Sequence, residues 1–250
     1  MIFPPAFLSV LLPAYLVLFT AMKAPQKVKL TYFNIEGVAE KVRLALLLTG
    51  TPFEDERIAF PQWAEMKPKT PYGQLPVMKI DDGEEFAQSG AMLRWAGRLG
   101  DSSLYPVEDA KKVMEIEEVL GLCDDLSKAW GPALYISMAP QNFGYPPEFS
   151  KTDEGKAKVK ELREKFVAEK LPDLMKYFGS KLKKHGGDKF LCGDKPTIAD
   201  LTAVPLFRNF QKGHIDFVPK DCLDKYEDIC AYIKRFMELP PVAEWYASKA

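Results

Sequence analysis

The sequence predicts an α/β domain followed by an all-helical domain. Segments with the alternating pattern and β-branched residues of strands occur in the first hundred residues, where they alternate with helical segments. Every periodic segment beyond Tyr105-Pro106 has helical spacing. The 250 residues, 47% of them hydrophobic, suffice for one large or two small domains with a sizeable core.

The first predicted strand is VKLTYF at residues 28–33, which alternates and is rich in β-formers. Gly37 opens a helix whose apolar residues recur at helical spacing until Gly50 ends it. Residues 53–58 predict a second strand. The polar, Pro-rich stretch 61–71 that follows predicts a loop.

Residues 75–80 and 84–87 predict two strands joined by the turn Asp81-Asp82-Gly83, and residues 89–99 predict a helix. The order strand, helix, strand, strand, strand, helix describes a thioredoxin-like domain over residues 27–104. Its first two strands would be parallel and joined by a right-handed crossover.

The second domain is expected over residues 107–249. Pro172 should kink or split a long amphipathic region, and four prolines within 130–155 predict a loop. Thr197 and Asp200 form a capping box, in which a hydroxyl caps the helix and a carboxylate three residues later bonds back. The predicted helices cover residues 107–129, 154–185, 197–211, 222–237 and 240–249.

The composition excludes several classes of function. Lys and Arg number 34 against 35 Asp and Glu, so the net charge of -1 gives no electrostatic reason to bind nucleic acid. The two histidines, His185 and His214, exclude a His-rich metal site, and we expect no metal. The cysteines are too few and too scattered for a disulfide scaffold or a Cys-x-x-Cys zinc site, and fit reduced structural thiols: Cys123, Cys192, Cys222 and Cys230.

Residues 1–22 carry no charged side chain, and about 20 apolar residues can span a bilayer. Prolines within the segment weaken such a helix, and the basic region and cleavage site of a signal peptide are missing. The segment is therefore either a targeting or anchor sequence or the product of a misassigned start, with Met22 as the true one. The folded part is expected in the cytoplasm, or in the secretory pathway or on a membrane if the segment is retained.

Two features of the first domain could carry chemistry at the ends of strands. Tyr32 ends the first strand, and ligands of open α/β sheets bind in the loops after strands. A cis bond between Leu75 and Pro76 would turn the Leu75 backbone outward, where an extended peptide could pair with it. Alternatively, Tyr32 is an aromatic residue packed in the core, and Pro76 is an ordinary proline at the start of a strand.

Two further features could bind carboxylates. Gln88 and Ser89 lie at the start of the helix after the hairpin, where free N–H groups favour an anion. Trp63 and Lys67 lie four residues apart and could hold a second carboxylate through an indole N–H and an ammonium. Plain helix capping would also explain Gln88 and Ser89. A surface cation beside a partly buried aromatic ring would also explain Trp63 and Lys67. Taken together, the four features describe a groove for an acidic, extended peptide.

Three segments resemble the cytosolic glutathione transferases: TYFNIEGVAEKVRLALLLTG, WAEMKPKTPYGQLPVMKIDDGEEFAQSGAMLRWAGRLG and LCGDKPTIADL. The resemblance covers about residues 27–247. It is closest to the sigma class, which includes glutathione-dependent prostaglandin D synthases and lens S-crystallins. It implies a detoxifying transferase, with glutathione as co-substrate and a small hydrophobic electrophile as the second substrate, in a homodimer.

The resemblance also implies roles for individual residues. Tyr32 would be catalytic and donate a hydrogen bond to the glutathione sulfur. Asp125 would reach the γ-glutamyl amine in the neighbouring subunit, although it could equally be a solvated helix carboxylate. The remaining residues implied to contact glutathione are Trp63, Lys67, Gly73, Gln74, Leu75, Pro76, Gln88 and Ser89.

The sequence departs from the sigma-class pattern on either side of Gly37. Glu36 and Val38 stand where some members carry arginines, so a cation that could assist the thiolate is missing and Glu36 adds negative charge. This weakens the case for prostaglandin isomerisation more than the case for conjugation. A glutathione-dependent isomerase or peroxidase and a non-catalytic, crystallin-like protein are the alternatives. The electrophile is expected to bind between the domains, and its identity is left open.

Overall fold

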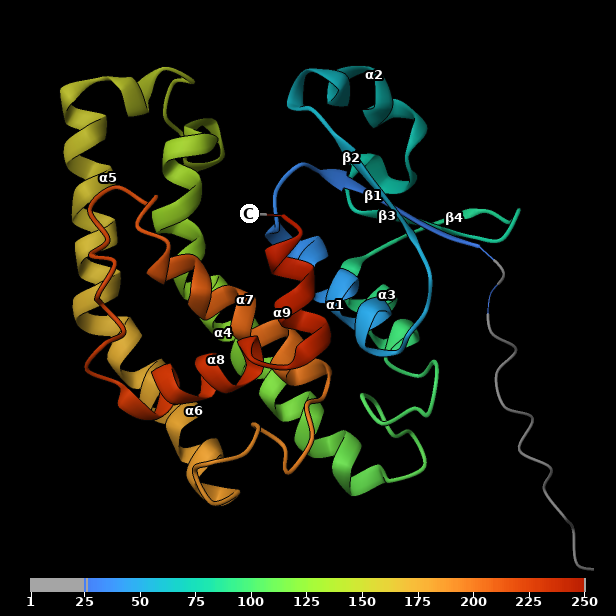
Figure 1. Ribbon diagram of the computed structural model, residues 1–250. Helices are drawn as coiled ribbons and strands as arrows, with labels where there is room; N and C mark the ends of the chain where they lie inside the picture. The colour runs from blue at the N-terminus through green and yellow to red at the C-terminus, as the bar shows by residue number, and fades with distance from the viewer. Residues whose placement is uncertain (1–24, 26, 250) are drawn as a thin grey trace, which may run out of the picture.

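The computed structural model describes residue 25 and residues 27–249, so the apolar segment 1–22 lies outside it. The described chain forms two halves, one built around a β-sheet and one of helices alone (Figure 1). This confirms the predicted fold class. Within the described residues, we find no helix with the length and apolar character needed to cross a membrane.

The sheet has four strands in the order β2-β1-β3-β4. β1 (Val28–Phe33) pairs in parallel with β2 (Glu54–Ile58), whereas β3 (Val77–Ile80) is antiparallel to both β1 and β4 (Glu85–Ala87). Alternation along β1 places Leu30 in the core with the apolar side chains of two helices, α1 (Glu40–Leu48) and α3 (Ser89–Ala96). Figure 1 shows these helices on one side of the sheet and α2 (Trp63–Met66) on the other.

The prediction of a loop over residues 61–71 is wrong. This stretch is a series of short helical turns, because each proline stands in the first turn of a helix, where its missing N–H breaks no helical hydrogen bond. Besides α2, the turns are the 3₁₀ helices Phe60–Gln62, Lys67–Lys69 and Pro71–Gly73.

The helical half surrounds α7, most of whose residues are buried. Pro172 stands in the first turn of α6 (Leu171–Lys184), directly after the π-helical turn Phe166–Lys170, so a π-helical turn and not a loop separates the two α-helices of the amphipathic region. The helices are α4 (Ala110–Met138), α5 (Asp153–Lys165), α6 (Leu171–Lys184), α7 (Ile198–Gln211), α8 (Glu227–Met237) and α9 (Pro240–Ala247).

The prediction that residues 130–155 form a loop is partly wrong, because α4 continues through Pro132 to Met138. The proline removes one helical hydrogen bond, but the turn on either side of it buries Trp130, Ala133 and Ile136. Burial of these side chains offsets the lost bond. The rest of the stretch contains two 3₁₀ helices, Pro140–Phe143 and Phe149–Lys151.

The cysteines of the described chain are free thiols, and Cys123, Cys192 and Cys222 are buried in the helical half. Burial raises the pKa of each of these thiols, to about 12 for Cys192 and about 11 for Cys222. They are therefore protonated at neutral pH and act as small apolar side chains.

The predicted capping box starts α7. Asp200 is fully buried, and its Oδ2 accepts from the Thr197 backbone N–H at 2.7 Å. Its Oδ1 accepts from the Leu191 backbone N–H at 3.0 Å and from Tyr232 Oη at 2.8 Å. One carboxylate therefore ties together the helix start, the preceding loop and α8.

We predict that Asp200→Asn lowers the free energy of unfolding by about 2–4 kcal/mol, because an amide N–H₂ would face donors inside the core. Urea unfolding followed by circular dichroism measures this change. Asp194→Asn is the matched control, since Asp194 forms a surface ion pair with Lys189, and we expect it to cost under about 1 kcal/mol. Equal losses in the two variants would contradict the role assigned to Asp200.

Candidate active site

The register of the sheet brings together three sites that the sequence places far apart. Thr31 on β1 pairs with Val77 on β3, and Val77 pairs with Ala87 on β4. The next residues at this end of the three strands are all predicted site residues: Tyr32, Pro76 and Gln88. They lie at the carboxyl end of β1, where the sheet opens toward the helical half (Figure 1).

Tyr32 is 8% exposed, and its oxygen lies against the loop that follows β1. A Cβ built on Gly37, whose φ is +47°, would lie 2.6 Å from the Tyr32 Oη. Burial raises the pKa of Tyr32 above its ordinary value, while the backbone N–H of Val38 acts in the opposite direction. The phenol is therefore neutral at physiological pH and can donate a hydrogen bond.

A buried arginine holds this loop. Arg43, on α1, is 0% exposed, and its Nη1 donates to the carbonyl oxygens of Ile35 at 2.9 Å and Glu36 at 3.2 Å. Its Nε donates to Asp55 Oδ1 on β2 at 2.8 Å. Sequence reasoning missed Arg43, because arginine in an amphipathic helix usually marks the solvent face.

The peptide bond between Leu75 and Pro76 is cis, which decides between the two interpretations of this proline. Leu75 lies two residues before Val77, where the ladder with β1 ends. Its backbone is thus outside the sheet and beside the end of β1.

Gln88 is the N-cap residue of α3 and has φ of 73° and ψ of 98°. A positive φ is unusual for a residue with a side chain, and such conformations gather at functional sites. The Gln88 carbonyl accepts from the N–H groups of Ala91 and Met92, while its side chain is exposed. Ser89, half-buried, is the first residue of the helix, where the positive end of the dipole favours an anion.

Trp63 and Lys67 lie on one helical turn, since the Lys67 N–H donates to the Trp63 carbonyl. The half-buried Trp63 ring meets Phe33 edge-on, with centroids 6.0 Å apart, next to Tyr32. The Lys67 side chain runs beside Gly73, where a built Cβ would lie 3.6 Å from it. Gln74 follows and is exposed.

Asp125 does not lie with the predicted site residues of the first domain. It lies exposed on α4, and the preceding Asp124 faces Lys41 on α1. Burial lowers the pKa of Lys41, and the Asp124 carboxylate raises it.

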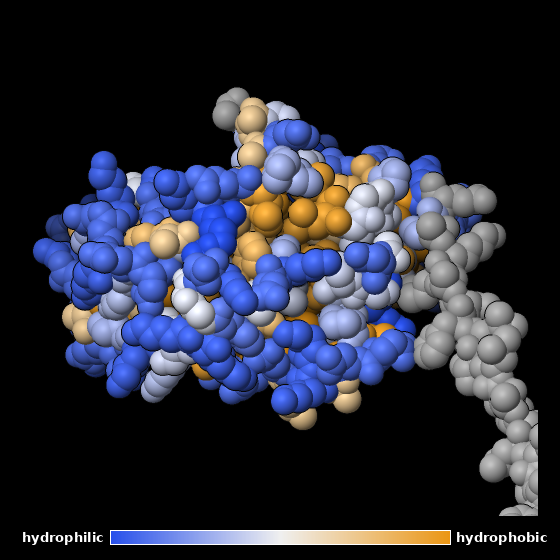
Figure 2. Space-filling view, turned by 60° about the horizontal axis from the view of Figure 1, so that its bottom comes forward, coloured by the Kyte–Doolittle hydropathy of each residue, from blue (hydrophilic) through white to orange (hydrophobic). Residues whose placement is uncertain are grey.

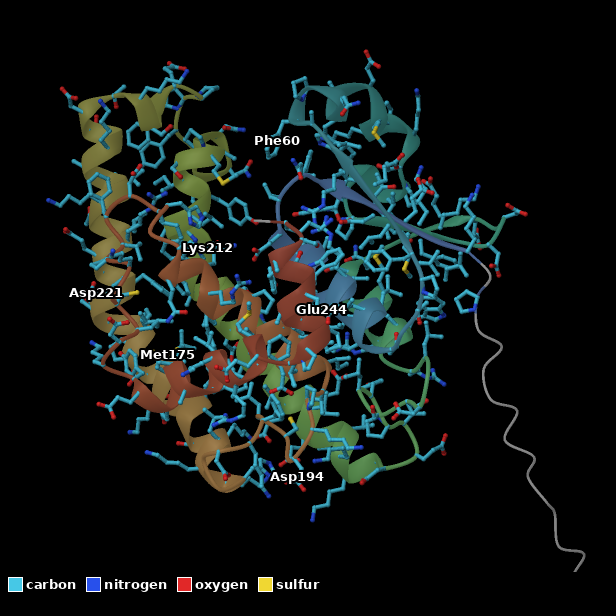
Figure 3. The ribbon with its side chains drawn as sticks, viewed as in Figure 1. Phe60, Met175, Asp194, Lys212, Asp221 and Glu244 are labelled. Atoms are coloured by element: carbon cyan, nitrogen blue, oxygen red, sulfur yellow. The ribbon has the colours of Figure 1, made fainter. Side chains whose placement is uncertain are left out.

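The negative charge that Glu36 adds to the loop after β1 is paired with two cations. Its Oε1 lies 2.7 Å from Lys212 Nζ and its Oε2 lies 3.5 Å from Arg208 Nη1. Both cations come from the end of α7, so the helical half neutralises Glu36. In Figure 3, Lys212 and Phe60 lie on the sides of the two halves that face each other.

Exposed apolar side chains come from both halves near the site. Val38, beside Gly37, is 49% exposed, and Phe60, after β2, is 60% exposed. On α4, Tyr135 is 48% exposed and is close enough to Tyr32 to affect its pKa. Figure 2 shows the molecule with the bottom of Figure 1 turned forward. On this face, hydrophobic residues gather in the middle and hydrophilic residues surround them.

Comparisons with known proteins find relatives over most of the chain. The family model for the glutathione S-transferase N-terminal domain matches residues 28–98, and that for the C-terminal domain matches residues 148–249. Glutathione S-transferase 1 of Ascaris suum is 30% identical over 222 residues, which cover 88% of this chain and 96% of the relative. The class-mu 28 kDa isozyme of Schistosoma japonicum is 29% identical, with 89% and 97% covered.

Solved structures give the same result. The prostaglandin synthase D of Nilaparvata lugens has a TM-score of 0.72 and 27% identity, and the match covers 90% of this chain and 98% of that one. The glutathione S-transferase of Ascaris lumbricoides has a TM-score of 0.65 and 28% identity, with 90% and 98% covered. The chain therefore belongs to the glutathione S-transferase family. It is an enzyme, a glutathione transferase, and its relatives carry several class names.

We predict that Gly37→Ala lowers kcat/KM by about tenfold or more, because the new methyl group would push on the Tyr32 hydroxyl. Gly50→Ala is the control. Gly50 also has a positive φ, of +65°, but a Cβ there meets nothing within 4 Å. Both variants should lose about 1 kcal/mol of stability from the strained backbone, and only the first should lose activity. Equal kcat/KM values for the two variants at equal stability would contradict the close contact between Gly37 and the Tyr32 hydroxyl.

Proposed function

We propose that this enzyme conjugates glutathione to small apolar electrophiles and that Tyr32 activates the thiol. The observation that supports this most is the buried phenol, held neutral at the end of the sheet beside the backbone of Leu75 and the N-terminus of α3. A free thiol has a pKa of about 8.5, so little of it is thiolate at pH 7. A neutral O–H donor stabilises the thiolate more than the thiol.

The groups present can supply the free energy needed to lower the pKa of the glutathione thiol. Lowering the thiol pKa by about two units takes about 2.7 kcal/mol. A hydrogen bond to a charged acceptor contributes about 1.5–3 kcal/mol, so the Tyr32 hydroxyl supplies most of it. The thiolate then attacks the electrophilic carbon, and the phenol remains protonated throughout.

The other contacts follow the shape of the tripeptide. Leu75 would pair with the cysteinyl backbone, as an added strand does. Gln88 and Ser89 would hold the γ-glutamyl carboxylate at the start of α3. Trp63 and Lys67 would hold the glycyl carboxylate, with the backbone of Gly73, Gln74 and Pro76 completing the wall.

An apolar electrophile is supported by the exposed side chains of Val38 and Tyr135, which come from the two halves and flank Tyr32. Conjugation needs only the thiolate and a nearby apolar surface. We therefore favour it over isomerisation, which would have to direct the reaction of one particular substrate.

We further propose that the active form is a homodimer with a sigma-class-like arrangement, in which Asp125 binds the γ-glutamyl amine in the neighbouring subunit. Asp125 is exposed and unused within its own chain's site. Tyr72, in the loop before Leu75, is 79% exposed with φ of 57°, and so large an exposed aromatic side chain is typical of an interface.

We predict that Tyr32→Phe lowers kcat/KM for a chloronitrobenzene electrophile at saturating glutathione by about 10²-fold at pH 7. The pKa that governs this rate should return toward about 8.5 in the variant. In the unchanged protein the rate should not fall up to about pH 10, because burial keeps Tyr32 neutral beyond its ordinary pKa. Tyr177→Phe, at a half-exposed ring on α6, is the control. Equal rates for the two variants would refute the role of Tyr32.

We predict that Asp125→Asn raises the KM for glutathione by about three- to tenfold and leaves kcat nearly unchanged, because it weakens binding of an amine remote from the sulfur. Sedimentation should show a dimer for both proteins. A monomer with full activity would reject the shared site, and Asp153→Asn, at an exposed carboxylate on α5, is the control.

A further inference from the structure

A chain of hydrogen bonds connects the C-terminal helix to the loop beside Tyr32. Trp245 Nε1, on α9, donates to Glu40 Oε1 at 3.0 Å, across 205 residues of sequence. Glu40 lies on α1 and is 1% exposed, and its second oxygen accepts from Arg43 Nη1 at 3.0 Å. Figure 1 shows α9 lying beside α1, between the two halves.

Arg43 passes this connection on to the loop. The same Nη1 donates to the carbonyls of Ile35 and Glu36, and the guanidinium carbon lies 5.8 Å from the centre of the Tyr32 ring. Gly37, the next residue of the loop, lies against the Tyr32 Oη. Orientation of the guanidinium thus determines where the loop meets the phenol.

A second connection runs from the same helix to the same loop. Arg208 lies over the Tyr246 ring, 4.0 Å from its centre, and pairs with the Glu36 carboxylate. The loop is therefore held through its carbonyls by Arg43 and through a side chain by α7, and α9 supports both cations.

We propose that α9 is a positioning element of the thiol-activating site and that Trp245 is its positioning residue, acting through Glu40 and Arg43. The proposal rests on the proposed role of Tyr32. Without the indole donor, Glu40 keeps Arg43 and the Tyr246 hydroxyl as its partners, and the Glu40–Arg43 pair is held less firmly in one orientation. The loop then loses its fixed contact with the phenol, and the O–H no longer points at the sulfur.

Trp245→Phe tests this with little change in packing, because a phenyl ring can keep the contact with Phe53, whose centroid lies 5.9 Å from that of Trp245. Trp95→Phe is the matched control. Trp95 lies on α3, half-buried, and its indole makes no hydrogen bond within the described part of the chain. Both variants are made in the full chain, with thermal unfolding followed by circular dichroism to compare stability.

The first measurement needs no substrate. Hydrogen exchange followed by mass spectrometry should show residues 34–38 exchanging about tenfold faster in Trp245→Phe than in Trp95→Phe, with β1 unchanged. The second is the pH dependence of kcat/KM for the electrophile at saturating glutathione. We expect the governing pKa to rise by about one unit and kcat at pH 7 to fall about tenfold, with the KM for glutathione within about twofold.

A third variant, Glu40→Gln, breaks the same connection at its centre and should reproduce both effects. The double variant with Trp245→Phe should then be no worse than the more damaged single variant. Unchanged exchange of residues 34–38 would overturn the proposal, as would a loss of stability with an unchanged pH profile. Should Tyr32 prove to have no role in activity, the exchange experiment would still decide whether α9 holds the loop.

Discussion

The position of the loop beside Tyr32 depends on the buried guanidinium of Arg43. Burying this charge is costly, and the cost is offset because two carboxylates, on Glu40 and Asp55, and two loop carbonyls surround it. These partners come from α1, β2 and the loop after β1, so one side chain joins the elements around Tyr32. A neutral or shorter side chain would remove the cation that Glu40 and Asp55 share and the donor to the two loop carbonyls.

The residue that we propose to activate the thiol, Tyr32, is thus distinct from the residues that position it. Tyr32 performs the chemistry that we propose, with an ordinary phenol kept neutral by burial. Two residues around it fix the position of the Tyr32 Oη. Gly37 leaves room for this oxygen, and Arg43 holds the loop that contains Gly37. Residues of α7 and α9 contact Glu36 and Glu40, so both halves of the described chain contribute contacts around the loop beside Tyr32.

Much of the fold and part of the site could be predicted from the sequence. Alternation in residues 28–33 predicted β1, and the turn Asp81-Asp82-Gly83 predicted the hairpin of β3 and β4. Local patterns did not predict the burial of Arg43, since Asp55 and the two loop carbonyls that it contacts lie outside its own helix. The continuation of α4 through Pro132 also depends on tertiary packing, which outweighs the local preference of proline.

The buried thiols of the helical half have a consequence for an enzyme that handles electrophiles. Any accessible thiolate of the protein would compete with glutathione and be alkylated by the second substrate. Burial keeps Cys123, Cys192 and Cys222 protonated and shielded, so these three thiols are poor nucleophiles. The same packing that builds the helical core therefore makes these three thiols poor targets for an electrophile.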